Sequence, residues 1–201
     1  MQPFDTVTGA AAPLLAANID TDVIMPKQFL KGIDRSGLDN GVFFDMRFLK
    51  SGAPNPDFVL NQPQWHDARF LVTGPNFGCG SSREHAVWGL KQLGIRALIG
   101  THFAGIFFDN CQRNGVLAIE LPEREWRQLA RTVSEQNPAI SVDLPRQQIR
   151  LGDGSQIDFT IDALRKQSLM QGLDAIGSTL QRAAQIREFE ASYHAAHPWL
   201  R

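Results

Sequence analysis

The sequence predicts an α/β fold with a mostly parallel central sheet, flanking helices and a small antiparallel annex. Apolar runs of strand length alternate with helical patterns through the middle of the chain, an order typical of parallel strands joined by right-handed crossovers. Nearer the carboxyl end, runs of alternating apolar and polar residues flank strong turn signals, which favours antiparallel strands. The chain shows no internal repeat and no low-complexity linker, so we expect one domain over residues 1–201.

The parallel part of the sheet is expected in the middle of the chain. Its predicted elements, in order, are a strand at 68–73, a helix at 83–93, a strand at 95–100, a helix at 103–113 and a strand at 116–121. Asn114-Gly115 is a favourable helix stop, because glycine readily takes the left-handed conformation that ends many helices. Pro122 suits the first turn of a further helix over 123–135, in which acidic residues lead.

The remaining segments add to this centre on both sides. The elements expected there are a short strand and a loop over 14–30, a loop over 31–40, one or two helical turns at 45–49, strands at 140–144, 148–151 and 156–161, and helices at 162–170 and 180–194. Pro54, Pro56 and Pro63 exclude a regular element from residues 51–67. The strands near the carboxyl end form the expected annex.

Composition and charge exclude several classes of protein. The chain has 20 lysines and arginines against 21 aspartates and glutamates, a formal net charge of −1, and its basic residues do not cluster as nucleic-acid binding requires. No apolar run approaches the roughly 20 residues that cross a bilayer. The first residues lack the basic segment and apolar core of a signal peptide, so we expect a cytoplasmic protein without nucleic-acid or membrane partners.

The cysteine count limits the metal chemistry. The two cysteines, Cys79 and Cys111, are too few for a disulfide scaffold or a typical zinc site. Fe–S clusters are held mainly by several thiolates, so this chain is not expected to hold one alone. Asp20 and Asp22 lack the continuation of a calcium loop, and we expect them to stabilise their loop through Asx turns, with orientation of a partner or of an active-site arginine as a further role for Asp22. We therefore predict no metal site on this chain.

The most informative segment is residues 76–85, Asn-Phe-Gly-Cys-Gly-Ser-Ser-Arg-Glu-His. It joins a predicted strand to a predicted helix, where free backbone N–H groups and the positive end of the helix dipole favour an anion or an alkoxide. Gly78 and Gly80 permit positive φ and a close approach of the backbone to a ligand. The alternative is structural, because Ser81 or Ser82 would also serve as a helix cap. The segment lacks the Lys-Ser/Thr pair of a phosphate loop.

The whole decapeptide resembles the signature of the aconitase-superfamily swivel domain, and in detail that of the isopropylmalate dehydratase small subunits. Four other segments resemble the same family in the same order, namely 18–30, 54–61, 159–162 and 172–180. The resemblance extends over essentially the entire chain. It implies a single swivel-type β/β/α domain, which is consistent with the predicted order of elements.

The resemblance also implies a chemistry. Enzymes of the aconitase type remove and re-add water across a carbon that bears a carboxylate. This requires a base for a weakly acidic C–H, cations for the carboxylates and a Lewis acid for the departing hydroxyl. Position by position, Ser81 matches the catalytic serine of the family, which acts as the base in its alkoxide form, and Arg83 matches the catalytic arginine that holds a substrate carboxylate. Ser82 matches a neighbouring hydroxyl that contacts substrate.

Further substrate contacts are expected from the segment near residue 30. Arg35 precedes Ser-Gly at a position where the family often has a second arginine, and we predict that it binds substrate, with a solvated loop arginine as the alternative. Phe29, Leu30 and Ile33 lie in the segment that meets the variable side chain of the substrate in this family. Apolar residues there suit an isopropyl group, although folding back onto the core would also account for them.

The resemblance implies a hydro-lyase subunit that isomerises 2-isopropylmalate to 3-isopropylmalate through 2-isopropylmaleate, in leucine biosynthesis. It implies a dicarboxylate substrate and a separate large subunit that carries a [4Fe-4S] cluster, and the isolated small subunit is expected to be inactive. Three alternatives remain open. They are a homoaconitase or citramalate-type small subunit that differs mainly at residues 29–35, a stand-alone anion-binding or regulatory module, and a purely structural companion subunit.

Overall fold

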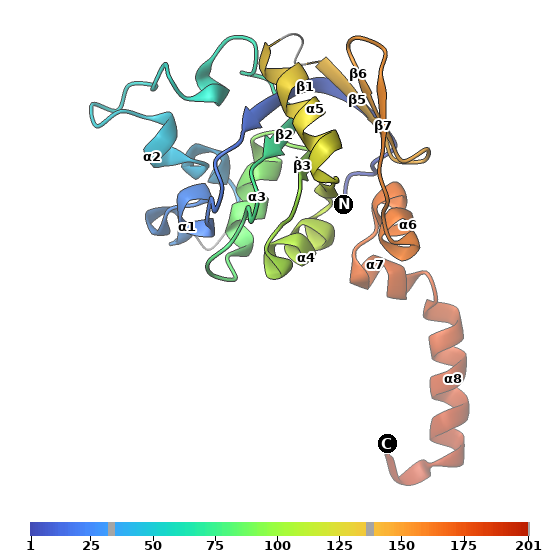
Figure 1. Cartoon of the computed structure of the whole chain (residues 1–201). Coiled ribbons are helices and arrows are strands. Elements are labelled where there is room, and N and C mark those ends of the chain that lie inside the picture. The colour runs from blue at the N-terminus through green and yellow to red at the C-terminus, as the bar shows by residue number, and fades with distance from the viewer. Residues whose placement is uncertain (32–34, 136–138, 201) are drawn as a thin grey trace.

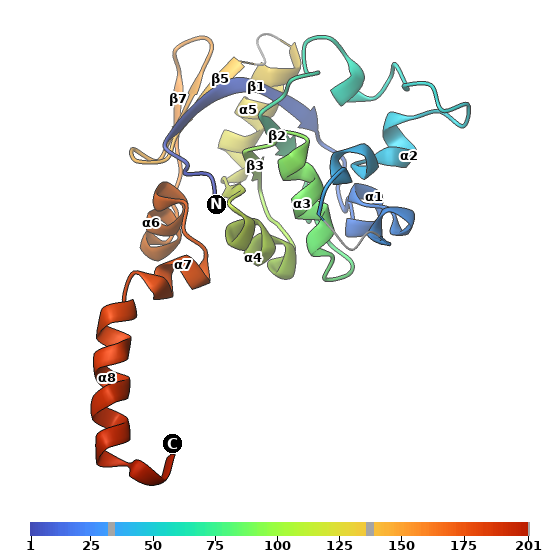
Figure 2. The ribbon, with the colours of Figure 1, turned by 180° about the vertical axis from the view of Figure 1, so that it is seen from behind.

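A computed structural model describes residues 1–31, 35–135 and 139–200, which form a mixed sheet with helices on both faces (Figure 1, Figure 2). The strands of the described residues are β1 (Thr6–Leu14), β2 (Phe70–Thr73), β3 (Ala97–Gly100), β4 (Leu117–Glu120), β5 (Ala139–Asp143), β6 (Gln148–Leu151) and β7 (Gln156–Asp158). Their order across the sheet is β4-β3-β2-β1-β5-β6-β7. The first four strands run parallel to one another, and β5, β6 and β7 pair antiparallel, so the predicted α/β fold is confirmed.

β1 joins the two halves of the sheet. Residues 6–10 pair with β5 in an antiparallel ladder, and residues 11–14 pair with β2 in parallel. The predicted short strand from residue 14 is therefore wrong, because the strand ends there. The segment contains three alanines as well as Gly9 and Pro13, which have low strand propensity, and its hydrogen bonds to two neighbouring strands override that propensity.

The helices of the described residues are α1 (Thr21–Ile24), α2 (Phe44–Arg47), α3 (Glu84–Gln92), α4 (Gly105–Asn114), α5 (Glu123–Glu135), α6 (Ala163–Gln171), α7 (Ala175–Leu180) and α8 (Ala183–Ala196), with 3-10 turns at Lys27–Leu30, Leu38–Gly41, Val59–Asn61 and Pro198–Leu200. α3 and α4 cover one face of the parallel strands, where Leu90 shares a core with Leu71. α5 covers the other face, where Leu129 shares a second core with Val72. Leu71 and Val72 are neighbours on β2, and successive side chains of a strand point to opposite faces.

The helices near the carboxyl end differ from the prediction. The helix expected over 180–194 is confirmed as α8, which begins three residues and ends two residues later than expected, whereas α7 before it was not predicted. Asp174 is the N-cap of α7, and its side chain accepts a hydrogen bond from the N–H of Gly177 at 2.7 Å. The strand expected over 156–161 ends at Asp158, since the chain then turns into α6, which Asp162 caps.

α8 projects from the body of the molecule as an arm (Figure 1, Figure 2). α6 and α7 lie beside the sheet, and α8 extends away from them without a single buried residue. Neither α8 nor any other helix of the described residues is long and apolar enough to cross a membrane.

Candidate functional site

The site predicted around Ser81 lies at the carboxyl ends of the parallel strands. The loops that follow β1, β2 and β3 meet there. Backbone hydrogen bonds join them, because the N–H of Gly78 donates to the carbonyl of Ile19 at 2.8 Å and the N–H of Ala104 donates to the carbonyl of Phe77 at 3.1 Å. Open α/β sheets bind their ligands at this edge. The topology therefore puts the decapeptide where a ligand site is expected.

The glycine-rich turn takes a backbone that few other residues adopt. Gly78 has φ of 77° and Gly80 has φ of 92°, both in the left-handed region that glycine tolerates. A Cβ on Gly78 would lie 2.1 Å from Cγ of Phe107, a buried side chain of α4. At Gly80 the nearest atom to an added Cβ would be Cβ of Asp20, at 3.4 Å. Glycine at position 78 is therefore required for the turn to pack on α4.

Gly78→Ala is expected to lower the free energy of unfolding by about 2–4 kcal/mol, because the methyl group displaces the Phe107 ring and alanine must keep a positive φ. Calorimetry should show a Tm lower by about 5–15 °C. Gly105→Ala is the matched control, since a Cβ there meets no atom within 4 Å at the first residue of α4. Its Tm should be unchanged or slightly raised. Equal Tm values for the two variants would contradict the packing requirement.

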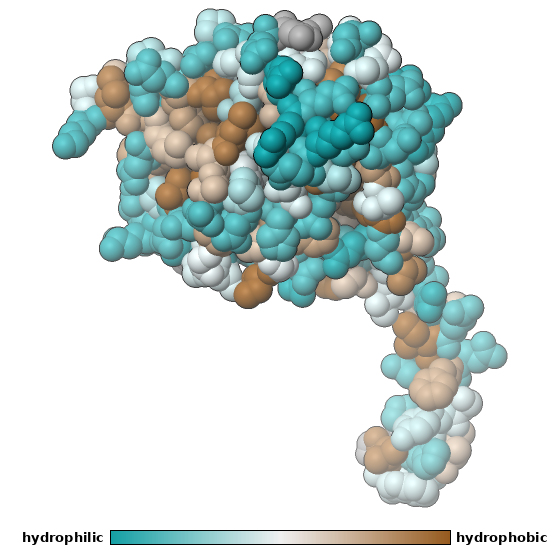
Figure 3. Space-filling model, viewed as in Figure 1, coloured by the Kyte–Doolittle hydropathy of each residue, from teal (hydrophilic) through white to brown (hydrophobic). Residues whose placement is uncertain are grey.

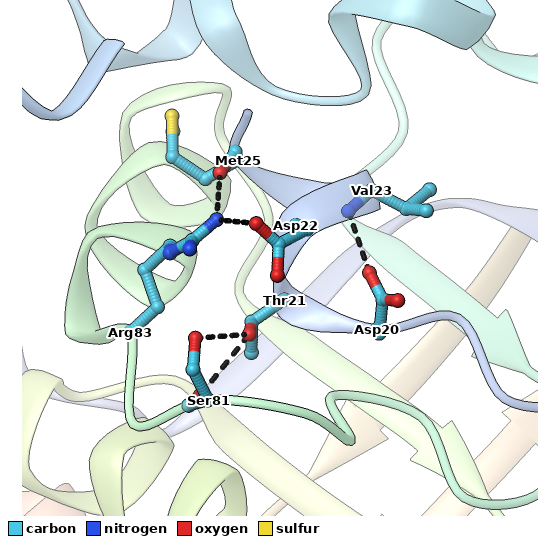
Figure 4. A network of polar contacts seen from close by, with 7 residues as sticks. All are labelled: Asp20, Thr21, Asp22, Val23, Met25, Ser81 and Arg83. Atoms are coloured by element: carbon cyan, nitrogen blue, oxygen red, sulfur yellow. Dashed lines mark hydrogen bonds and ion pairs between the residues drawn. The ribbon is translucent and has the colours of Figure 1, made fainter. Parts of the chain in front are cut away.

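Ser81 lies exposed at the end of this turn, and Thr21 fixes its position (Figure 4). The Oγ1 atom of Thr21 lies 3.2 Å from Oγ of Ser81, and the Thr21 hydroxyl donates to the carbonyl of Ser81 at 3.0 Å. Thr21 is only 1% exposed, and its N–H donates to the carbonyl of Cys79 at 2.9 Å. A buried and fixed threonine therefore holds a serine that remains accessible to solvent.

Neither serine serves as the N-cap of α3. The helix begins at Glu84, one residue later than predicted, and its N-cap is Arg83, whose side chain makes no capping hydrogen bond. The capping alternative for Ser81 and Ser82 is therefore wrong. Ser81 lies three residues before the first helical residue. Thr21, which contacts the Ser81 hydroxyl directly, therefore acts on it at shorter range than the helix end does.

The loop that follows β1 orients Arg83. Its Nη1 lies 2.5 Å from Oδ1 of Asp22 and donates to the carbonyl of Met25 at 3.0 Å (Figure 4). The Arg83 side chain is 15% exposed, whereas that of Asp22 is 58% exposed. Asp22 belongs to α1, which Asp20 caps by accepting from the N–H of Val23 at 2.8 Å. The predictions that these aspartates stabilise the loop and that Asp22 orients an arginine are confirmed.

Arg35, the predicted second arginine, contacts α3. Its guanidinium carbon lies 4.0 Å from the ring centroid of Trp88, and its carbonyl accepts a hydrogen bond from the side chain of Gln92. A cation over an aromatic face is attractive by about 0.5–2 kcal/mol. Arg35 thus packs against α3, the helix that directly follows Arg83. Ser82 is exposed just before the same helix.

The apolar residues predicted to meet the substrate pack partly on the core. Phe29 and Leu30 lie in the 3-10 turn, are half buried and contact the core shared by α3 and α4. The Phe29 ring lies 5.0 Å from that of Phe44, between centroids. These side chains fold back onto the body in part and keep some surface exposed. Ile33, the third residue of this group, lies outside the described residues.

Thr21 is the site residue that sequence reasoning missed. It has no charge, and its contact with Ser81 joins residues 60 positions apart in the sequence. One signal in the sequence is its place between Asp20 and Asp22, in the segment 18–30 that resembles the family. A hydroxyl there lies at the same sheet edge as the decapeptide.

The two cysteines differ in their surroundings. Cys111 is buried in α4, and burial raises the pKa of its thiol, whereas Cys79 is half buried in the turn beside Ser81. Among the described residues, no group of three or more His, Cys, Asp and Glu side chains is placed to hold a metal ion. Because Fe–S clusters take several thiolates, the donor set of this chain does not fit one.

Family comparisons match nearly the whole chain. A family model described as the aconitase C-terminal domain matches residues 1–124, one described as LeuD_N matches residues 127–163, and one described as the C-terminal domain of the 3-isopropylmalate dehydratase small subunit matches residues 176–201. "3-isopropylmalate dehydratase small subunit 1" of Mannheimia succiniciproducens is 62% identical over 100% of both chains. "3-isopropylmalate dehydratase small subunit 2" of Salmonella typhimurium is 56% identical, over 100% of this chain and 97% of its own.

The fold also has a solved counterpart. The crystal structure of a 3-isopropylmalate dehydratase from Methanocaldococcus jannaschii matches with a TM-score of 0.64 at 23% identity, over 92% of this chain and 99% of that one. The likeness shows that the two chains share the curled α/β sheet and its flanking helices.

Proposed function

Because this chain belongs to the 3-isopropylmalate dehydratase small-subunit family, we propose that it works with a large subunit to isomerise 2-isopropylmalate to 3-isopropylmalate in leucine biosynthesis. The reaction is a dehydration to 2-isopropylmaleate followed by rehydration in the opposite sense. The structural observation that carries the proposal is the exposed Ser81, held by Thr21 beside the oriented guanidinium of Arg83.

Ser81 is the base of this proposal. Its deprotonated oxygen takes a proton from the CH₂ carbon of 2-isopropylmalate while hydroxide leaves the neighbouring carbon and a double bond forms between the two. In rehydration a proton returns from Ser81 to the carbon that bears the isopropyl group, and hydroxide adds to the other carbon. One proton and one hydroxide are thus removed and restored, and the serine ends deprotonated, as it began.

Thr21 is a positioning residue for this base. When its single hydroxyl proton is donated to the carbonyl of Ser81, the Ser81 hydroxyl donates to Oγ1 of Thr21. When Ser81 has lost its proton, rotation about the Cβ–Oγ1 bond lets Thr21 donate across the same 3.2 Å. A hydrogen bond to the charged form of a group favours that form, so Thr21 supports the alkoxide.

Arg83 binds a substrate carboxylate. The contacts to Asp22 and Met25 both engage Nη1, and the opposite edge of the guanidinium, Nε with Nη2, has the fork geometry that a carboxylate takes in a bidentate pair. Asp22 and Met25 therefore fix the plane of the guanidinium before substrate arrives. Such preorganisation places the carbon acid within reach of Ser81.

The remaining predicted residues complete the substrate side of the proposal. Arg35 supplies a second cation for the other carboxylate, and Ser82 supplies a hydroxyl at the approach to α3. Phe29, Leu30 and Ile33 supply an apolar surface for the isopropyl group.

The large subunit supplies what this chain lacks. Two cysteines do not fit an Fe–S cluster, so the large subunit would hold the cluster, which would supply Lewis acidity toward the substrate hydroxyl. The isolated chain is accordingly expected to be inactive.

Anaerobic co-purification of the full chain with the large subunit of the same organism tests the proposal. We expect the pair to form 3-isopropylmalate from 2-isopropylmalate and each protein alone to form none. Full turnover by this chain alone would refute the two-subunit arrangement. A higher kcat/KM for homoaconitate or citramalate than for isopropylmalate would instead identify the alternative small subunit, and exchanging residues 29–35 would then move the preference.

A further inference from the structure

The carboxyl-terminal arm, defined here as residues 183–200, carries aromatic side chains on an exposed helix. None of the residues of α8 is buried. Phe189 is 64% exposed, Tyr193 is 40% exposed, and Trp199, in the turn that follows, is 74% exposed. Figure 3 shows apolar side chains along the arm, well separated from those of the body. These exposures are large for aromatic residues, which usually bury most of their surface.

The aromatic rings of the arm form one continuous stripe. The Phe189 and Tyr193 rings stack with centroids 5.6 Å apart, the Tyr193 and His197 rings lie 4.5 Å apart, and the His197 and Trp199 rings lie 5.2 Å apart. Spacings of four residues keep side chains on one helix face. The charged pair Arg187 and Glu188 lies on other faces, because one residue turns a helix by about 100°.

The stripe needs a partner for energetic reasons. An isolated helix of 14 residues is marginal in water, and in proteins the packing of an apolar face supplies most of its stability. Tyrosine and tryptophan are the residue types that concentrate at interface hot spots, where they enter well-packed pockets of the partner. The arm therefore has the composition of an interface element, and none of its helical residues is buried against the rest of the described chain.

Two observations favour the large subunit as the partner. The aconitase C-terminal domain model ends at residue 124, whereas residues 176–201 match the model named for the 3-isopropylmalate dehydratase small subunit, so the arm goes with the separate small subunit. The arm also extends beyond α7 on the side of the body where α1 and α4 lie (Figure 1, Figure 2). Thr21 is the first residue of α1 and Ser81 lies shortly before α3, so a large subunit that covers this side of the body would contact both the loops of the site and the arm.

We propose that the arm docks its aromatic stripe onto an apolar surface of the large subunit and so holds the two chains together beside the active site. This inference rests on the proposed function for the identity of the partner. A groove of about 590 Å³ lies where α6, α7 and the base of α8 meet; its lining is mostly polar, with Leu164, Leu173 and Ile186 as its apolar residues.

The double variant Phe189→Ala/Trp199→Ala tests the proposal in the full chain. We expect its Kd for the large subunit, measured anaerobically by calorimetry, to rise tenfold or more, since truncation of a single hot-spot aromatic is enough to weaken an interface by that factor. At saturating large subunit, kcat should stay within about twofold of the wild type. Arg187→Ala/Glu188→Ala, on the other faces of the same helix, is the matched control and should change Kd by less than about twofold.

Three outcomes separate the inference from its rivals. An unchanged Kd for the aromatic variant overturns it. Self-association of the isolated chain that the aromatic variant abolishes also overturns it, because the stripe then binds a second copy. If the wild type, the aromatic variant and the charged control bind the large subunit with the expected Kd values but the wild-type pair forms no 3-isopropylmalate, the arm's role is supported and the proposed function fails.

Discussion

Ser81→Ala in the assembled enzyme is expected to lower kcat by about 10²- to 10⁴-fold while KM changes little, because a general base acts in the transition state and contributes little to substrate binding. kcat and kcat/KM should fall together. Steady-state formation of 3-isopropylmalate at saturating large subunit measures both constants. Size-exclusion chromatography should show an unchanged complex, since Ser81 is exposed and caps no helix. Retained turnover would favour the regulatory or structural alternatives.

The neighbours of Ser81 provide the controls for that variant. Ser82→Ala keeps the base and should lose far less activity. Thr21→Val keeps the shape of the side chain but removes the donor to the Ser81 oxygen, so the pKa of the Ser81 hydroxyl should rise and the rising limb of the pH–rate profile should move to higher pH. Thr21→Ser retains the hydroxyl and should restore the wild-type profile. A pH profile that Thr21→Val leaves in place would assign the threonine a purely structural role.

The sequence predicts the central part of this fold well because its signals there are local. α5 has the predicted bounds, and Gly115 ends α4 in the left-handed conformation that its sequence favours. β1 escaped prediction because Gly9, the three alanines that follow it and Pro13 have low strand propensity, and pairing with distant β2 and β5 makes the segment a strand. α7 was not predicted either, because its six residues are too few for helical periodicity to show.

The site shows the same division between local and distant contacts. Ser81 and Arg83 are found together because they share one motif, and the parallel strand order predicts the sheet edge on which they lie. Their partners come from 60 and 61 residues away, Thr21 and Asp22. Asp22 was predicted to orient an arginine. For Thr21 the sequence contains one indication of a role in the site, namely its position between Asp20 and Asp22. The predicted start of α3 at residue 83 would have made Ser82 its N-cap, whereas the observed start at Glu84 makes Arg83 the N-cap. Hydrophobic periodicity does not define a helix boundary to within one residue.

Arg83→Lys is expected to raise KM for 2-isopropylmalate by about 10- to 150-fold, which corresponds to roughly 1.5–3 kcal/mol for a hydrogen bond to a charged group. Lysine keeps the positive charge, but its point charge cannot contact Asp22 and the Met25 carbonyl while also presenting a planar fork to a carboxylate. Because the carboxylate is held in the ground state as well as in the transition state, KM should change more than kcat. This is the reverse of the pattern expected for Ser81→Ala.

Arg127→Lys is the matched control for this substitution. Arg127 also pairs with a carboxylate, that of Glu123 at 2.9 Å, but both side chains lie exposed on α5, which covers the opposite face of the sheet from α3. Exposed pairs of this kind contribute about 0–1 kcal/mol, so KM should stay within about twofold. If KM for Arg83→Lys also stayed within about twofold of the wild-type value, the Arg83 guanidinium would serve only to connect its own loop to Asp22 and Met25. The substrate carboxylate would then need another cation. Arg35, held on the Trp88 ring, is the first candidate, and Arg35→Lys measured in the same assay would then show the rise in KM that Arg83→Lys lacked.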